Sequence, residues 1–366
     1  MSENEFIKGE NFAEEKADCN EQSANANFQS FNSANPYNFF YPSFATAEFL
    51  EKEKEKKEIK KAARAAGISF LSGELLITAI SFVIVFVLEL ISEYYFSAIS
   101  ILEDPAIMHV LQVFLSSAIY TLPFIITYKI CGYRISSLVS YKKPPKRQVL
   151  PYFLFGVGFC TISNIASGII SSFFGNLGIE YEVDYYENPE GIFGLILVII
   201  STVITPALVE EFACRGIVLG SLRKFGDGFA IITSALLFGL MHGNFEQIPF
   251  AFFVGLILGF VTVKSGSLRI AMLIHAFNNA FSVALSYLLP FLPPEFQDIA
   301  YVGIFSFLLL ISLLGFGILK TAEDYRLEEA DTRASEKEKY GWFFTGIFII
   351  IFIFVCFTSS LSFFVG

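Results

Sequence analysis

The chain has 366 residues, of which 54% are hydrophobic and only 16% charged, and its mean hydropathy is +0.59. A typical soluble domain carries about 25% charged residues, so this composition excludes an ordinary soluble protein and predicts a polytopic membrane protein. The net charge of −10 comes from tails and loops and indicates no particular partner. The five scattered cysteines contain no CxxC pair, so neither a disulfide framework nor a thiolate metal site is predicted.

The first 66 residues are predicted to lie outside the membrane. Residues 1–45 are polar and lack the basic start and apolar core of a cleaved secretory signal. Such a segment buries too little apolar area to order itself, so we expect a disordered tail. Residues 46–66 alternate Glu and Lys among good helix formers, which predicts a solvated helix leading to the membrane. Contact of its Lys-rich end with anionic lipid headgroups is the alternative.

Nine apolar segments follow, which predicts an all-α, polytopic transmembrane bundle of about nine spans. A helix of about 20 residues crosses the hydrocarbon core, so the short fifth and sixth segments fit a tilted or partly re-entrant course. Glycines and serines in the third segment permit close helix contact. The segments are residues 71–91, 110–128, 152–174, 192–222, 229–243, 250–263, 268–288, 299–319 and 342–364.

The distribution of basic residues predicts the orientation of the bundle. Every lysine and arginine except Arg215 falls in one alternate set of connecting segments, and the other set carries only acidic residues. By the positive-inside rule the basic side is cytoplasmic. We therefore expect a bacterial plasma-membrane protein with its N-terminus in the cytoplasm and its C-terminus outside.

The fourth segment carries three ionisable residues, Glu210, Glu211 and Arg215, within an otherwise apolar run. Ionisable residues at bilayer depth are costly and are functional candidates by default. Glu211 and Arg215 stand at i and i+4 in the favoured order, so they can pair on one helix face. Glu210 lies about 100° round the helix and has no basic partner at i+4. An unpaired buried carboxylate must be protonated, bind a cation or meet imidazoles.

Two of the three histidines lie in the neighbouring apolar segments. His242 follows Phe238 by four residues, so the phenyl ring can pack over the imidazole, and His275 precedes Asn279 by four residues. His109, near the outer end of the second segment, is expected to be an interfacial residue. Each feature alone is typical of a structural role, but Glu, His, His and Asn are the side chains that activate water on a carbonyl and stabilise an oxyanion, with or without a metal.

The ordered motifs Glu-Glu-x-x-x-Arg, Phe-x-x-x-His and His-x-x-x-Asn resemble the CAAX-protease and bacteriocin-processing (CPBP, or Abi) family of intramembrane endopeptidases. The eukaryotic relative of that family is the Ras-converting CAAX prenyl endopeptidase. The resemblance covers about residues 190–290, the expected catalytic core. Residues 67–189 and 291–366, the latter with a charged cytoplasmic loop at 320–341, are expected to be additional membrane regions.

The resemblance implies a role for each motif residue. Glu210 would be the general base on a water, assisted by His242. His275 and Asn279 would stabilise the oxyanion, while Glu211 and Arg215 would hold the geometry. A second view of such families gives a zinc ion to Glu210, His242 and His275, and His₂Glu is a catalytic zinc set in other folds. The sequence leaves metal-dependent and metal-independent hydrolysis both open.

Depth along the helices bears on where the site lies. At about 1.5 Å per residue, His275 lies about 9 Å from the nearest cytoplasmic basic residue, Glu210 about 20 Å and His242 about 27 Å. Convergence then requires helices that project into the cytoplasm or a seventh segment that begins deeper. We expect a site in the cytoplasmic half of the membrane, reached through a water-filled cone.

Three functions are compatible with these residues. The first is an intramembrane endopeptidase whose partners are membrane lipid and a protein or peptide substrate, possibly prenylated as in CAAX proteins, and not nucleic acid. The second is a non-catalytic protein of the same fold that confers self-immunity to a bacteriocin. The third is an ion-coupled transporter, because Glu, Arg and His also build proton relays, although no internal repeat is evident.

Overall fold

The computed structural model describes residues 44–92, 99–176, 189–245, 247–322 and 327–362, and within these ranges the regular structure is helical, without strands. The chain divides into two compact units, residues 1–51 and 52–366. The predicted disordered tail falls almost wholly outside the described residues. The prediction of an all-α bundle is confirmed for the residues that the structure describes.

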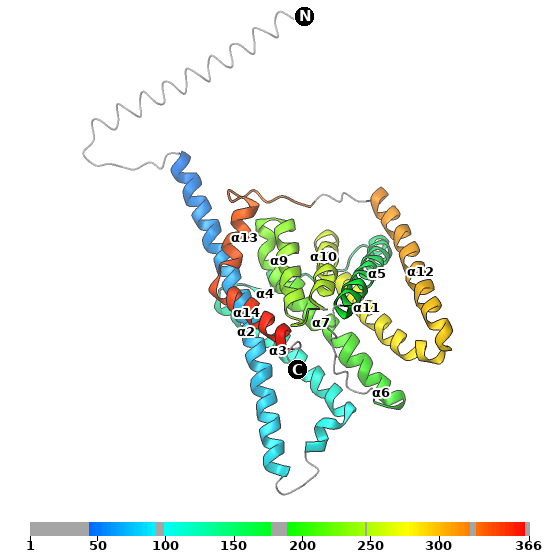
Figure 1. The fold of residues 1–366 in the computed structure, drawn as a ribbon. Coiled ribbons are helices and arrows are strands. Elements are labelled where there is room, and N and C mark those ends of the chain that lie inside the picture. The colour runs from blue at the N-terminus through cyan, green and yellow to red at the C-terminus, as the bar shows by residue number, and fades with distance from the viewer. Residues whose placement is uncertain (1–43, 93–98, 177–188, 246, 323–326, 363–366) are drawn as a thin grey trace, which may run out of the picture. The chain divides into compact units, whose positions relative to one another are not determined.

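Figure 1 shows the order of the helices along the chain. The longer ones are α2 (Phe44–Ser92), α3 (Pro105–Ile130), α5 (Lys146–Asn176), α9 (Asp227–Leu240), α10 (Gln247–Ser265), α11 (Leu268–Leu288), α12 (Pro294–Ala322), α13 (Glu336–Phe344) and α14 (Ile347–Ser362). Between α5 and α9 lies a continuous helical rod of α6 (Gly191–Val198), η2 (Ile199–Ile204), α7 (Thr205–Glu211), η3 (Phe212–Val218), α8 (Leu219–Leu222) and η4 (Arg223–Phe225). Short turns η1 (Ile99–Glu103), α4 (Ile135–Leu138) and η5 (Leu289–Phe291) complete the order.

The number of candidate spans is lower than the sequence pattern predicts. Seven helices of the described part are long and apolar enough to cross a membrane, or eight if the bent pair α13 and α14 counts as one span. The fifth predicted span corresponds to α9, whose 14 residues extend only about 21 Å and fall short of a hydrocarbon core about 30 Å thick. The ninth is broken by a 72° bend between Phe344 and Ile347. Seven or eight candidate spans in the described residues are consistent with the predicted bundle of about nine, in which the short fifth segment was expected to be tilted or partly re-entrant.

The charged segment before the first span is not a solvated helix. Helix α2 continues without a break from the charged segment into the first apolar span. Ile59 and the alanines at 62, 63, 65 and 66 are fully buried, and they belong to the main hydrophobic core. Their small side chains permit close approach: a Cβ added to Gly67 would lie 2.7 Å from the backbone of Phe348 at the start of α14. The alternating charges occupy only the other faces of the helix.

Small residues also set the packing of α5, as the sequence predicts. A Cβ added to Gly158 would overlap Ser312 on α12, and one added to Gly156 would overlap Ile274 on α11. Helix α10 in turn packs against α9, α5 and α11. This packing places α11 beside both α5 and the rod of α6 to α8 (Figure 1), which is the arrangement that brings the motif residues together.

Candidate active site

The rod that carries the two glutamates is interrupted by π-helical turns on both sides of α7. The segment η2 ends just before Thr205 and η3 begins at Phe212, directly after Glu211. Pro206 follows Thr202 by four residues, and because proline has no N–H, the Thr202 carbonyl is denied its ordinary helical donor. Such π-bulges occur frequently at functional sites because they re-aim side chains within a helix.

Glu211 and Arg215 form a fully buried ion pair. Arg215 Nη1 donates to Glu211 Oε1 at 2.8 Å, and both side chains have zero exposure. The guanidinium carbon of Arg215 also lies 3.9 Å from the centre of the Phe238 ring, a cation–π contact. Gly255 on α10 leaves room for this side chain, since an added Cβ would lie 3.2 Å from Arg215 Nη2. The i,i+4 pairing expected from the sequence is thus present, and a neighbouring helix encloses it.

His275 of α11 lies against both glutamates. Its Nδ1 is 2.9 Å from Glu211 Oε1, and its Nε2 is 4.0 Å from Glu210 Oε2. An ionised carboxylate only accepts hydrogen bonds, so the Nδ1 atom carries a proton and donates it to Glu211. The carboxylate behind the ring fixes the tautomer and the orientation of the imidazole. The Nε2 atom is left on the side of Glu210, whose side chain keeps 13% exposure.

His242 lies in a turn and not within a helix, which differs from the sequence-based expectation. Helix α9 ends at Leu240, and Gly243 takes a positive φ of 65° that turns the chain away. The Nδ1 atom of His242 is 2.8 Å from the carbonyl of Phe238, so it donates to that oxygen. The same reasoning as for His275 leaves the Nε2 atom as the nitrogen available to a ligand or substrate.

The Phe238 ring connects the two histidines and the arginine. Its centroid lies 5.0 Å from that of His242 and 6.0 Å from that of His275, with both rings edge-on, in addition to the Arg215 contact. The ring is 2% exposed. The sequence indicated only that Phe238 packs over His242, and the structure adds its contacts with His275 and Arg215.

Asn279 lies against the backbone of the glutamate-bearing rod. Its Nδ2 atom donates to the carbonyl of Thr202 at 3.0 Å. Because a primary amide has two N–H groups, the second remains available. The neighbouring Asn278, which sequence reasoning passed over, is buried and approaches the Asn279 oxygen at 3.4 Å.

His109 is buried against the rod that carries the two glutamates. It is only 7% exposed, and its Nδ1 lies 2.7 Å from the hydroxyl of Ser201 in the π-helical η2 segment. It lies in the second turn of α3, which packs against η2, and its expected place at the membrane interface stays a prediction. The histidine therefore contacts the same π-helical segment that Asn279 binds.

The side chains of the predicted zinc set, Glu210, His242 and His275, are not arranged around one point. In the described part of the chain, no three His, Cys, Asp or Glu side chains are grouped so that they would hold a metal ion. The zinc set therefore does not fit as these side chains stand, and metal dependence stays a prediction to be tested.

These elements define a polytopic helical membrane protein with a buried cluster of two glutamates, two histidines and an arginine from neighbouring helices. Residues 192–281 match the family described as "Type II CAAX prenyl endopeptidase Rce1-like". The matched region contains all three motifs and supports the predicted resemblance to the CPBP family.

Two curated bacterial relatives support the same family. The chain is 26% identical over 161 residues to the "Membrane-embedded CAAX protease MroQ" of Staphylococcus aureus, which covers 40% of this chain and 62% of the relative. It is 25% identical over 143 residues to the "Putative membrane peptidase YdiL" of Bacillus subtilis, covering 35% and 57%. The matched region thus spans less than two thirds of either relative. No solved structure gives a significant match.

Proposed function

We propose that the protein is an intramembrane endopeptidase that hydrolyses a peptide bond of a membrane-associated protein or peptide. The observation that supports this most directly is the pair of contacts made by His275, with Glu211 behind its Nδ1 and Glu210 in front of its Nε2. The names of the two bacterial relatives describe a CAAX protease and a putative peptidase, which support the same reaction class. A prenylated, CAAX-type substrate rests on those names alone.

The nucleophile in this proposal is a water molecule. The 4.0 Å between Glu210 Oε2 and His275 Nε2 fits one water bonded to both atoms at about 2.8 Å each. Glu210 takes a proton as the water oxygen attacks the carbonyl carbon, and it later gives that proton to the departing amine nitrogen. The low exposure of Glu210 keeps bulk water from replacing this arrangement.

The oxyanion in this proposal is stabilised by donors on α11, while His242 assists Glu210. The Nδ1 atom of His242 donates its proton to the Phe238 carbonyl, so its Nε2 atom accepts hydrogen bonds. Asn279 has one further amide hydrogen, and His275 donates from Nε2 in its imidazolium form, in which both ring nitrogens carry a proton and Glu211 holds the ring. Fixed donors of this kind lower the barrier because they need no reorganisation as charge develops.

The experiment that tests the proposal compares the membrane proteomes of cells that carry the wild-type protein and the Glu210→Gln variant. Peptides with new C-termini present only with the wild type identify the substrate and its cleavage site. Identical proteomes, at matched levels of the two proteins, would contradict the proposal and favour a non-catalytic role. Measurement of the zinc content of the purified protein decides whether the metal prediction is correct.

A further inference from the structure

A chain of three asparagine side chains crosses from α5 to the glutamate-bearing rod through α11. Asn164 Nδ2 lies 3.3 Å from Asn278 Oδ1, and Asn278 Nδ2 lies 3.4 Å from Asn279 Oδ1. The chain ends at Thr202, whose carbonyl accepts from Asn279 at 3.0 Å. Asn278 is buried and the other two are half-buried.

The direction of this chain is fixed at both ends by backbone carbonyls. Asn164 Nδ2 donates to the carbonyl of Cys160 at 2.9 Å, one turn earlier in α5, and Asn279 Nδ2 donates to the carbonyl of Thr202. Because a carbonyl only accepts, each terminal amide must turn its nitrogen toward it. The middle amide then has one consistent orientation, in which its oxygen faces Asn164 and its nitrogen faces Asn279.

The acceptor at the end of the chain, the Thr202 carbonyl, lies four residues before Pro206 in the π-helical η2 segment. In a regular α-helix the Thr202 carbonyl would accept the N–H of residue 206, but proline has none. A buried carbonyl without a partner is costly, above all at membrane depth. The side chain of Asn279 supplies the missing donor, so the kinked rod and the third motif are joined at this oxygen.

We propose that Asn278 and Asn164 are positioning residues that hold the amide of Asn279 in its working orientation against the Thr202 carbonyl. The proposal rests on the proposed function, in which the second amide hydrogen of Asn279 faces the oxyanion. Without Asn278, the Asn279 oxygen loses its donor, and the amide is held only by its hydrogen bond to the Thr202 carbonyl. The donor is then misaligned in a fraction of molecules, which lowers the catalytic rate and leaves substrate binding intact.

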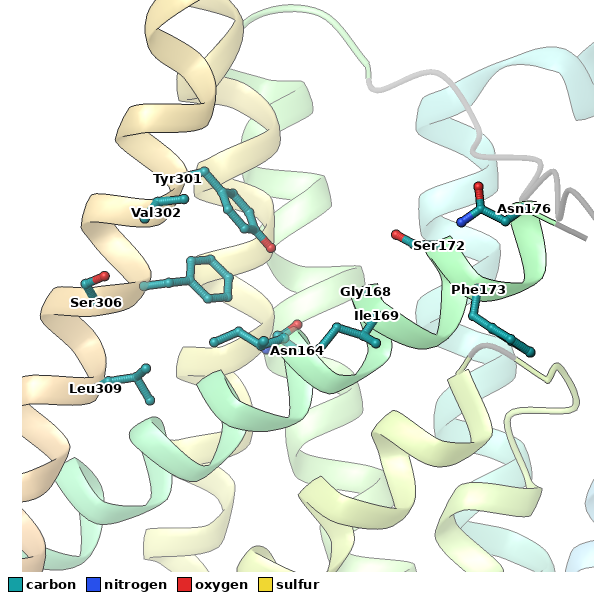
Figure 2. Close-up of a pocket in the computed structure, with 12 residues that line it drawn as sticks. Asn164, Gly168, Ile169, Ser172, Phe173, Asn176, Tyr301, Val302, Ser306 and Leu309 are labelled. Atoms are coloured by element: carbon teal, nitrogen blue, oxygen red, sulfur yellow. The ribbon is translucent and has the colours of Figure 1, made fainter.

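Asn164 also borders a cavity, and this provides a control. The cavity, of about 700 Å³, lies between α5 and α12 and is lined by Asn164 and Asn176 of α5 together with Tyr301 and Ser306 of α12 (Figure 2). Asn176 is an exposed asparagine at the far end of the same helix. Replacing Asn176 by leucine changes the polarity of the cavity wall in the same way as Asn164→Leu but leaves the three-amide chain intact.

The test measures kcat and KM for the purified protein in proteoliposomes. The probe is a quenched fluorescent peptide that carries the cleavage site found in the membrane-proteome comparison. Asn278→Leu and Asn164→Leu should each lower kcat about tenfold or more, as a misplaced catalytic group does, and change KM by no more than about twofold. Asn176→Leu should behave as the wild type. In an Asn279→Ala background, Asn278→Leu should cause no further loss.

Several results would overturn the proposal. A wild-type kcat for Asn278→Leu would contradict it. So would a double variant, Asn278→Leu with Asn279→Ala, whose kcat is lower than that of Asn279→Ala alone. An Asn176→Leu variant that loses as much kcat as Asn164→Leu would also contradict it. If Asn278→Leu does not fold, judged by its melting temperature, the Asn164→Leu variant on a different helix decides. Glu210→Gln is assayed in parallel: if it cleaves normally the proposed function itself is wrong, whereas an inactive Glu210→Gln with a fully active Asn278→Leu contradicts only the positioning role.

Discussion

His275 Nδ1 lies 2.9 Å from Glu211 Oε1, although 64 positions separate the two residues in the chain. The second glutamate of the motif therefore has two partners, since Arg215 binds the same oxygen at 2.8 Å. Glu211 orients the imidazole, and Arg215 compensates the charge of Glu211. The adjacent Glu210 lies 4.0 Å from His275 Nε2, and the proposed function gives it the role of general base.

Removal of Arg215 should destabilise the protein more than removal of the whole ion pair. Arg215→Met leaves the Glu211 carboxylate buried without its counter-ion, which costs roughly 3–5 kcal/mol in buried pairs. The double variant Glu211→Gln with Arg215→Met removes both charges and should recover part of the loss. Thermal unfolding in detergent measures this. Melting temperatures for Arg215→Met at or above those of the double variant would contradict the account.

Replacement of the Phe238 ring should impair catalysis more than folding. Phe238→Leu keeps an apolar side chain but removes the faces and edges that contact Arg215, His242 and His275. Cation–π and aromatic contacts of this kind contribute about 0.5–2 kcal/mol each, so the variant should fold. Its cleavage rate should fall while Phe253→Leu, at an exposed ring of α10, retains full activity. Equal rates for the two variants would argue against a role for Phe238 in aligning the histidines.

A methyl group added at position 255 of α10 should displace the side chain of Arg215. In Gly255→Ala the new Cβ would lie 3.0 Å from the Ala235 Cα and 3.2 Å from Arg215 Nη2. Such overpacking costs about 1–3 kcal/mol, which should appear as a lower melting temperature and reduced cleavage. The matched control is Gly228→Ala in the first turn of α9, where no atom lies within 4 Å of the added Cβ. We expect the control to have the melting temperature and the cleavage rate of the wild type. If Gly255→Ala matches the control in both, the close approach of α10 to Arg215 is dispensable.

Restoring a backbone N–H at position 206 should weaken the hydrogen bond between Asn279 and the Thr202 carbonyl. Pro206→Ala supplies an N–H that competes with Asn279 Nδ2 for the Thr202 carbonyl, so cleavage should slow without loss of thermal stability. Pro151→Ala, which replaces a proline inside α5, serves as the control for the general effect of removing a helical proline. Cleavage by Pro206→Ala at the wild-type rate would show that the freed carbonyl does not contribute.

The sequence predicts those features of this protein that depend on a single helix. Hydropathy located the helices, and i,i+4 spacing gave the Glu211–Arg215 pair. The same local reasoning failed for α2, where alternating charges suggested a solvated helix although alanines on one side are buried. The Ala-Ala-Arg-Ala-Ala run was the available signal, since small residues permit close helix contact.

Contacts between helices could be identified only from the structure. Three contacts depend on how α9 and α11 pack against the rod: the His275–Glu211 hydrogen bond, the Arg215–Phe238 contact and the hydrogen bond between Asn278 and Asn279. The periodicity within one segment does not specify how that segment packs against another. The end of α9 before His242 was visible only in retrospect, through Gly243 with its positive φ. The Thr202 acceptor was likewise present in the sequence, as the residue four positions before Pro206.

The most direct test of the central claim is the cleavage rate of the purified Glu210→Gln protein in proteoliposomes, measured beside the wild type and the Glu89→Gln variant. Glu89 is an exposed carboxylate near the C-terminal end of α2, so its replacement controls for the loss of a charge in a candidate span. The account predicts that Glu210→Gln folds with a wild-type melting temperature and has no measurable cleavage, while Glu89→Gln is fully active. Wild-type cleavage by folded Glu210→Gln would contradict it.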